Sequence, residues 1–427
     1  MKGIFTQNDR LEVIKKKGKI RLSIETEEIL REIADDFPDN PKEMGYFYER
    51  FNTFLGKKTT VDNDKKVIAT MCIHVPVELI YAVGAIPLRV CSGDYSMYRI
   101  GAEFLPANAC PLIKSTLGAI CLNTFLIDAK PAMIINPTTC DQRKKVGEMA
   151  VVASNRFYTL ELPPTKDTQE ARFYWQKVVK KLAKELERTT GQKLTRKKLK
   201  EAIGIESLAQ AQLRRLFKIR KGRPVILGKD AILVTNAYFF DDIISWTHGV
   251  SRLCTELEER ARQKQCVADQ SNPRIFIAGS PSIFPNIKLP LLVEKMGGIV
   301  VAEEFCSSSR FLYDPVAVDE WSLYDMIPAI ADRYLKPCTC PSFTPNIDRE
   351  RRILDNVREF SADGVIYRSF AGCRLYQIES NHIGKMLEEN GIPMLYIETD
   401  YTPDNTGQLS TRIEAFIELL QDRKTQR

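Results

Sequence analysis

Short apolar runs that alternate with helical segments are the feature that most limits the fold of this chain. In the carboxyl-terminal part, RIFIAGSP (274–281), GIVVAEEF (298–305), DGVIYRSF (363–370) and IPMLYIETD (392–400) have the length and composition of buried strands. KLPLLVEKMG (288–297) has the pattern of a helix that ends at glycine. Strands separated by helices pair in parallel, so we predict a parallel sheet whose functional loops lie at the carboxyl ends of the strands.

The amino-terminal half shows the same alternation. KKVIATMC (65–72) and IPLRV (86–90) are strand-like and flank a helix that begins after Pro76 and ends at Gly84, and AKPAMIINPTTC (129–140) is a further apolar run. The sequence therefore predicts an α/β fold with two Rossmann-like or flavodoxin-like lobes. We expect four regions: an N-terminal helical segment (1–64), a first α/β lobe (65–165), a mainly helical connecting region (166–272) and a second α/β lobe (273–427).

The length and composition agree with a globular protein of more than one core. The chain has 427 residues, of which 44% are hydrophobic and 27% charged, whereas one domain has roughly 100–200 residues. No run approaches the ~20 apolar residues that cross a bilayer, and the first residues contain no apolar stretch of the ~7–15 residues found in signal peptides. We expect a soluble, cytoplasmic protein that does not bind a membrane.

The net charge of +7 comes largely from one basic stretch, residues 177–200, and from the arginines and lysines that follow it. Apolar residues recur there at helical spacing, as in Val178, Leu182 and Leu186, and aromatic residues that would stack on bases are absent. We therefore expect no nucleic-acid partner. Two interpretations stay open, a solvated helix face and a docking face for an acidic partner.

The chain contains eleven cysteines and only three histidines, His74, His248 and His382. The cytosol keeps thiols reduced, and an odd number cannot pair completely, so a disulfide framework is disfavoured. No CxxC motif occurs, which disfavours zinc ribbons and ferredoxin-like runs. Metal ligation or burial must account for these thiols.

Six cysteines lie in predicted loops. Cys140, Cys306 and Cys373 come just after predicted strands, and we expect the fold to bring such loops together within each lobe. Cys110 precedes a helix in LPANACPLIKS, and the proline-rich segment KPCTCPSFTPN contains the other two loop cysteines, Cys338 and Cys340.

The other five cysteines fall in or beside predicted strands and helices, where core packing is the favoured interpretation because free cysteine is often buried. From the residues alone, the six loop cysteines are compatible with metal ligation and equally with structural or redox-sensing thiols. The five cysteines in or beside predicted strands and helices are Cys72, Cys91, Cys121, Cys254 and Cys266.

Segments along most of the chain, from about residue 45 to 420, resemble the 2-hydroxyacyl-CoA dehydratase and benzoyl-CoA reductase superfamily. The resemblance rests on HVPVELIYAVGAIPLRV (74–90), CPLIKS (110–115), Cys140-Asp141, GGIVVAEEFCSSSR (297–310), CTCPSFTPNIDRER (338–351), DGVIYRSFAGC (363–373) and GIPMLYIETDYTPDNTGQLSTRIEAFIE (391–418).

The resemblance implies a 4Fe-4S cluster held by three cysteines, which correspond to Cys110, Cys140 and Cys373 here. It also implies a separate ATP-hydrolysing activator protein, a homodimer with its own 4Fe-4S cluster, that supplies electrons. This chain has no GxxxxGK[ST] loop, in agreement with ATP hydrolysis on a partner.

The extra loop cysteines Cys306, Cys338 and Cys340 depart from the dehydratase pattern. With them the chain resembles the double-cubane cluster proteins, in which two linked 4Fe-4S units form an Fe8S9 centre in a homodimer. That branch implies an iron–sulfur reductase that uses ATP-dependent, low-potential electrons to reduce small unsaturated molecules, with six cysteine ligands. They would be Cys110, Cys140, Cys306, Cys338, Cys340 and Cys373.

Three functions remain open at this point. They are the double-cubane reductase, a 4Fe-4S subunit of a 2-hydroxyacyl-CoA dehydratase or aryl-CoA reductase, and a non-enzymatic electron carrier or maturation factor. Three residues are candidates for catalytic roles. His74 follows a strand and is a candidate proton donor, while Glu304 and Arg310 flank Cys306, where Arg310 would offset cluster charge or form an ordinary salt bridge.

Overall fold

The computed structural model of the chain describes residues 8–426 except 38, 56–64, 123–130, 154–156, 270 and 313. It contains two four-stranded parallel sheets, which confirms the predicted α/β fold with two lobes. The first sheet has the strand order β2-β1-β3-β4. Its strands are β1 (Val67–Thr70), β2 (Ile86–Arg89), β3 (Met133–Pro137) and β4 (Phe157–Leu160).

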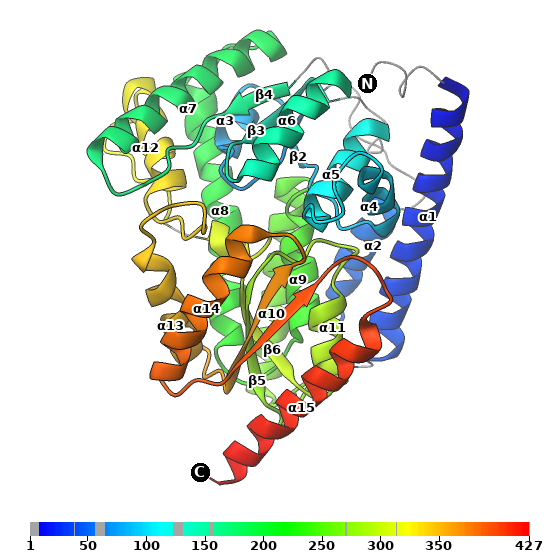
Figure 1. Cartoon of the computed structure of the whole chain (residues 1–427). Coiled ribbons are helices and arrows are strands. Elements are labelled where there is room, and N and C mark those ends of the chain that lie inside the picture. The colour runs from blue at the N-terminus through cyan, green and yellow to red at the C-terminus, as the bar shows by residue number, and fades with distance from the viewer. Residues whose placement is uncertain are drawn as a thin grey trace.

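The second sheet repeats this order as β6-β5-β7-β8. Its central strands β5 and β7 and the edge strand β6 are buried along nearly their whole length because helices cover both faces, as parallel sheets require. In Figure 1 the first lobe lies above the second. The strands are β5 (Arg274–Gly279), β6 (Ile299–Glu304), β7 (Gly364–Phe370) and β8 (Met394–Thr399).

Side chains on successive residues of the first sheet enter two different cores. Ala69 and Ile134 belong to a large apolar cluster that extends through the second lobe, whereas Ile68 and Ile135 pack into a separate cluster under the long connecting helices. This alternation follows from the two-residue repeat of a strand. The helices of the first lobe are α3 (Val77–Ala82), α4 (Tyr95–Ala102), α5 (Pro111–Leu122) and α6 (Asp141–Ala153).

The helices of the second lobe follow its strands, and α15 carries the carboxyl terminus away from the sheet (Figure 1). One of them, α12, packs against the first lobe's side of the molecule, on α7. The elements are α11 (Lys288–Lys295), the short 3-10 helix η1 (Ser309–Phe311), α12 (Leu323–Leu335), α13 (Ile347–Glu359), α14 (Arg374–Glu389) and α15 (Thr406–Thr425).

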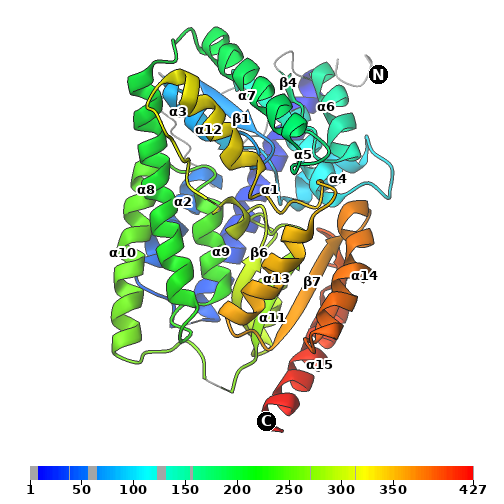
Figure 2. The same ribbon diagram turned by 90° about the vertical axis from the view of Figure 1, so that its left-hand side faces the viewer.

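Long helices from outside the two sheets complete the molecule. The apolar residues of the basic stretch, Val178, Leu182 and Leu186, are buried, as their helical spacing predicts. In Figure 2 the helices α8 and α10 lie side by side along one flank. These elements are α1 (Asn8–Asp35), α2 (Met44–Leu55), α7 (Gln169–Thr190), α8 (Arg196–Arg220), α9 (Gly228–Ala237) and α10 (Ile243–Arg262).

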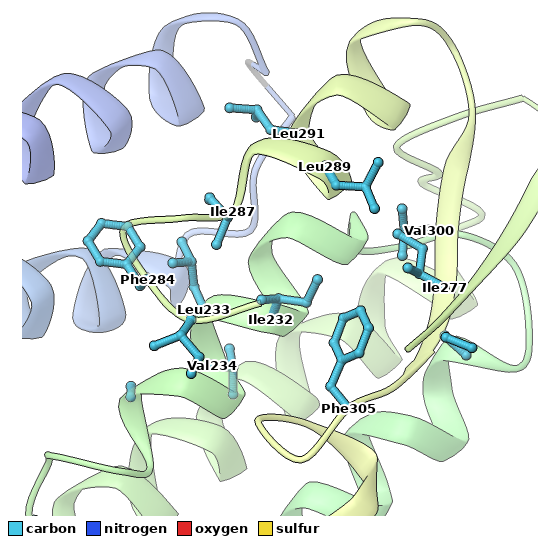
Figure 3. Packing of buried hydrophobic residues seen from close by; sticks show 14 of the residues in the cluster. Ile232, Leu233, Val234, Ile277, Phe284, Ile287, Leu289, Leu291, Val300 and Phe305 are labelled. Carbon is cyan, nitrogen blue, oxygen red and sulfur yellow. The ribbon is translucent and has the colours of Figure 1, made fainter. Parts of the chain in front are cut away.

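Helix α9 runs through the centre, and all ten of its residues are buried. Figure 3 shows its Ile232, Leu233 and Val234 among apolar side chains of the second lobe, including Phe305. Phe305 precedes Cys306, so this packing anchors the loop that carries the cysteine.

The carboxyl ends of the two sheets meet. Beyond β8, the Tyr401 hydroxyl donates to the carbonyl of Ser92, which follows β2, over 3.2 Å. At the end of β2, Arg89 Nη1 donates to the carbonyl of Cys306, after β6, over 3.1 Å. Ligands of open parallel sheets bind at the carboxyl ends of the strands, so we expect a functional site at the boundary between the lobes.

Candidate functional site

Three cysteines from three different loops converge where the lobes meet; we call them the thiol trio. Cys110 and Cys140 belong to the first lobe and Cys373 to the second. The thiols of Cys110 and Cys373 form a hydrogen bond with each other, the charge of Cys140 acts on Cys110, and the charge of Cys373 acts on Cys140. The sequence predicts that loop cysteines gather within each lobe, but this set gathers across the lobe boundary.

Each member of the trio stands at the start of a helix. Cys110 precedes α5, Cys140 precedes α6, and Cys373 is the N-cap residue of α14. Backbone N–H groups of the first helical turn point at each sulfur. Helix N-termini stabilise negative charge, so these N–H groups act to lower the pKa of each thiol.

One side chain holds the three loops in register. The amide of Gln142, two residues after Cys140, accepts a hydrogen bond from the backbone N–H of Cys110 over 2.7 Å and donates to the carbonyl of Gly372 over 2.8 Å. Gly372 has a φ of 77°, and a Cβ there would lie 2.0 Å from the carbonyl oxygen of Asn108. Glycine is therefore required for the Cys373 loop to approach the Cys110 loop this closely.

Ionisation differs within the trio. The hydrogen bond from Cys373 lowers the pKa of Cys110, and the same bond, which needs the Cys373 proton, raises the pKa of Cys373 well above its usual range. Burial raises the pKa of Cys140, and the nearby Arg143 guanidinium opposes this. Cys110 is the thiol of this set that ionises first.

The chemistry of the donor set decides what kind of group it would fit. Within the described ranges, no three or more His, Cys, Asp or Glu side chains are arranged to hold one metal ion. Three thiols on preformed loops, at three helix N-termini, are a soft and electropositive donor set of the kind that binds an anionic cluster of several irons. The trio would hold such a group, which supplies one-electron chemistry when bound.

A second thiol set lies next to the trio and contains Cys72, Cys91, Cys306, Cys338 and Cys340. The buried His74 joins two of them: its Nδ1 lies 3.2 Å from the sulfur of Cys72 and its Nε2 lies 3.3 Å from the sulfur of Cys338. The charges of Cys72 and Cys91 act on Cys306, and the charge of Cys72 acts on Cys340. Two neighbouring groups of thiols thus occupy the boundary between the lobes.

Burial raises the pKa of both Cys306 and Cys340 to about 11. Arg89 and then Arg310 oppose this shift at Cys306, and Arg310 opposes it at Cys340. Cys306 and Cys340 therefore stay protonated near neutral pH unless a metal displaces their protons.

The predicted catalytic residues Glu304 and Arg310 form a buried ion pair. Arg310 donates through Nε and Nη2 to the two carboxylate oxygens of Glu304, over 2.8 and 2.6 Å, and through Nη1 to the Tyr376 hydroxyl over 2.9 Å. Arg349 also pairs with Glu304, and Thr339 donates to it over 2.7 Å. Because Thr339 lies between Cys338 and Cys340, Glu304 fixes that loop to the Cys306 loop.

The remaining cysteines divide differently from the prediction. Cys254 is fully buried and Cys121 is half-buried, and both lie in helices as expected. Cys266 is exposed and lies beyond the end of α10, so its predicted place in a helical core is wrong. Core packing is the prediction for Cys72 and Cys91, yet they lie among the other thiols; their positions just after β1 and β2 are the sequence signal for this.

An apolar cavity opens beside the second thiol set. Its lining includes Cys91, Arg89 and Ser307, the neighbour of Cys306, together with aromatic side chains such as Phe239 and Phe284. About 60 Å³ of it is available to water-sized spheres. The Arg89 guanidinium stacks on Phe239 at 3.8 Å and forms part of the wall.

These features define a class of protein: a two-lobed α/β protein with paired parallel sheets and a cysteine-lined boundary between them. The family model described as 2-hydroxyglutaryl-CoA dehydratase, D-component, matches residues 72–420, and the chain belongs to this family. None of the described helices has both the length and the apolar character for crossing a membrane.

Curated relatives cover nearly the same span. YjiM of Escherichia coli (strain K12), named as a candidate dehydratase subunit, is 29% identical over 391 residues, 90% of this chain and 99% of its own length. The (R)-phenyllactyl-CoA dehydratase beta subunit of Clostridium sporogenes is 23% identical over 83% of this chain and 92% of its own. A benzoyl-CoA reductase subunit of Thauera aromatica is 22% identical over 82% of this chain and 88% of its own.

Proposed function

We propose that this chain is the iron–sulfur subunit of a 2-hydroxyacyl-CoA dehydratase or aryl-CoA reductase type of enzyme, with Cys110, Cys140 and Cys373 as ligands of a 4Fe-4S cluster. The observation that carries the proposal is the convergence of these three thiols at three helix N-termini, joined by Gln142. The family and the names of the relatives support the same function.

The chain's own residues would bind and shield the group. Burial of Cys110 keeps water away, the N–H groups at the starts of α5, α6 and α14 offset negative charge, and Arg143 adds a buried positive charge next to Cys140. The apolar cavity beside Cys91 and Ser307 fits the apolar part of a small substrate.

Partner proteins follow from the same proposal. The relatives are named as subunits, one of them as a beta subunit, which supports a second, non-identical subunit. Electrons would come from a separate ATP-hydrolysing activator, since this sequence has no phosphate-binding loop of its own. With ATP and a chemical reductant but no activator, we expect negligible turnover; rapid turnover under those conditions would contradict this part of the proposal.

The second thiol set favours a second candidate function, a double-cubane reductase of small unsaturated molecules. Cys306, Cys338 and Cys340 lie next to the trio, together with Cys72 and His74. A homodimer with an Fe8S9 centre would use the three as additional ligands. In that case both thiol sets bind iron.

Iron and acid-labile sulfide per chain, measured on anoxically purified protein, distinguish the two candidates. About four irons that disappear in Cys110→Ala and persist in Cys306→Ala support the dehydratase or reductase subunit. About eight irons that fall in both variants support the double-cubane centre. Cys266→Ala, at an exposed site outside the helices, is the matched control, and a protein without iron in its wild-type form would refute both candidates.

A further inference from the structure

A second, polar cavity lies behind the second thiol set, and the proposed function does not use it. Residues near the ends of β1 and β2 and on α8 and α12 line it. Apolar side chains such as Val75 and Phe311 make up much of the wall, and we call the cavity polar after the other lining residues, Cys72, Arg89, Glu206, Tyr238, Arg333 and Tyr334. About 30 Å³ is available to water, and one buried water needs roughly 10–15 Å³ of such space, so the cavity holds about two waters.

Three wall residues present polar atoms that have no partner among the described residues. They are Oε2 of Glu206, Nε of Arg333 and Nε of Arg89, on side chains that are 2%, 8% and 5% exposed. Folded proteins rarely leave such buried atoms unpaired. Water in the cavity is the partner that fits, because these three side chains supply both donors and an acceptor and the space admits a water.

The carboxyls at one end belong to a hydrogen-bonded set. Glu206 Oε1 accepts from the Tyr238 hydroxyl over 2.8 Å and from Gln210 Nε2 over 3.0 Å. Behind the wall, the Tyr334 hydroxyl donates to Glu78 Oε2 over 2.9 Å, and Glu78 is fully buried, with no partner for Oε1 in the described part of the chain. The cavity therefore has two buried carboxyl groups near one end.

Cys72 and Arg89 also line the cavity. Cys72 is bonded to His74, and His74 is in turn bonded to Cys338. Arg89 donates to the carbonyl of Cys306 and also lines the apolar cavity described above. The polar cavity thus has in one wall set the carboxyl group of Glu206, Cys72 of the second thiol set, and Arg89, which it shares with the candidate substrate cavity.

We propose that this polar cavity is an internal proton store, in which water connects the carboxyl group of Glu206 to the Cys72 side of the second thiol set. The inference rests on the aryl-CoA reductase form of the proposed function, because reduction at the lobe boundary consumes protons whereas dehydration consumes none overall. The carboxylic acid of Glu206 gives one proton, relayed by the water, to the substrate under reduction and becomes a carboxylate, which then takes up one proton from solvent. Within the store only O–H bonds form and break, and no electron moves through it.

The surroundings of Glu206 suit a group that both binds and releases a proton. Burial and the neighbouring carboxylate of Glu78 raise its pKa to about 7, while Arg333 and the hydrogen bonds from Tyr238 and Gln210 act in the opposite direction. The other ionisable groups that face it are Tyr81 from α3, Tyr334 from α12 and Arg214 from its own helix.

Infrared difference spectra of the purified protein between pH 5 and pH 9 test the store without turnover. We expect protonated-carboxyl absorption that titrates near pH 7, to which the buried Glu294 also contributes, and the Glu206 part of it should be lost in Glu206→Gln. Glu201→Gln, on the exposed face of the same helix, should retain the band. Tyr238→Phe removes a hydrogen bond that favours the carboxylate, so its titration should move to higher pH.

Turnover of the iron-loaded protein gives the second readout. In Glu206→Gln we expect unchanged iron content and a rate at least about tenfold lower, with loss of the pH dependence near 7. An absent band, or full turnover in this variant, would overturn the proton store. If wild-type protein lacks iron but shows the band, the proposed function fails while the titrating carboxyl stands. If Glu206→Gln does not fold, the Tyr238→Phe titration decides, and an unmoved midpoint overturns the inference.

Discussion

The two lobes have the same strand order, but the buried arginines beside their equivalent cysteines are neutralised in different ways. Cys91 follows the second strand of the first lobe and Cys306 follows the second strand of the second lobe. Beside Cys306, Arg310 is paired with the carboxylate of Glu304. Beside Cys91, Arg143 is fully buried and donates to the carbonyl of Met71 and the sulfur of Cys91, and within the described residues it contacts no carboxylate.

The difference indicates where negative charge belongs. Burial acts to lower the pKa of Arg143, yet thiolate charge at Cys91, Cys72 and Cys140 outweighs it and raises that pKa above its usual value. The first lobe therefore leaves a buried cation for thiolates to neutralise, whereas the second lobe supplies its own carboxylate. An anionic centre held by the thiol trio would complete the first lobe.

The equivalence extends to the other loop cysteines. Cys140 and Cys373 follow the third strands, β3 and β7, and Cys110 and Cys338 precede helices between the second and third strands. Yet the trio takes two of its members from the first lobe and one from the second. The relative position of the lobes, rather than the repeat within each, decides which thiols meet.

The largest expected effect is on iron binding by the two thiol sets. Cys373→Ala removes a thiol from the trio and should abolish nearly all bound iron. Cys306→Ala alters the second set and should leave about four irons per chain in a dehydratase-type subunit. Iron and sulfide analysis after anoxic purification measures the iron content of both variants. If both variants lost all of their iron, the two thiol sets would not differ in iron binding.

The next largest expected effect is on protein stability and concerns Glu304, the carboxylate that the second lobe supplies. Burial works to raise the pKa of Glu304, but Arg310 and Arg349 outweigh it and hold that pKa at about 2. Arg310→Met breaks a fully buried pair and should lower the free energy of unfolding by about 3–5 kcal/mol, measured by urea denaturation of iron-free protein. The control is Lys221→Met, whose pair with Glu359 is half-exposed and should change stability by about 0–1 kcal/mol.

The Glu304 pair also predicts a pH dependence. A carboxyl whose pKa is lowered in the folded state stabilises the protein above its unfolded pKa of about 4.5, and this stabilisation is lost as the pH falls towards 2. Glu304→Gln should therefore lose less stability than wild type over that interval. If the free energy of unfolding fell equally in both proteins as the pH is lowered, the ion-pair assignment would be contradicted.

Much of the fold follows from the sequence, because buried parallel strands appear as short apolar runs. Every strand except β4 is predicted; its four residues, FYTL, are partly exposed and too few to show a pattern. The grouping of the cysteines is not predictable, since it depends on how two separate lobes are placed. Sequence reasoning misses the role of Gln142 because an amide that bonds two distant backbones has no signature beyond its position next to Cys140.

Gln142 provides a smaller test of the contact between the lobes. Gln142→Ala leaves the N–H of Cys110 and the carbonyl of Gly372 without this partner, which should lower stability by about 1–3 kcal/mol and speed the loss of iron. Gln421→Ala, on the exposed side of α15, is the matched control. Unchanged iron release in Gln142→Ala would mean that the trio is held by its own helices alone.

The smallest expected change in stability is at Arg143, and it tests the contrast between the lobes most directly. In iron-free protein, Arg143→Met replaces a buried cation that has no carboxylate partner among the described residues. The free energy of unfolding should therefore fall by less than about 1 kcal/mol, or it should rise. The same variant should bind iron more weakly, because the thiolates lose a neighbouring positive charge. Urea denaturation and iron uptake, measured on the same preparation, separate these effects. A loss of stability as large as that of Arg310→Met would show that Arg143 is already neutralised without the centre, and the two lobes would then be alike in charge.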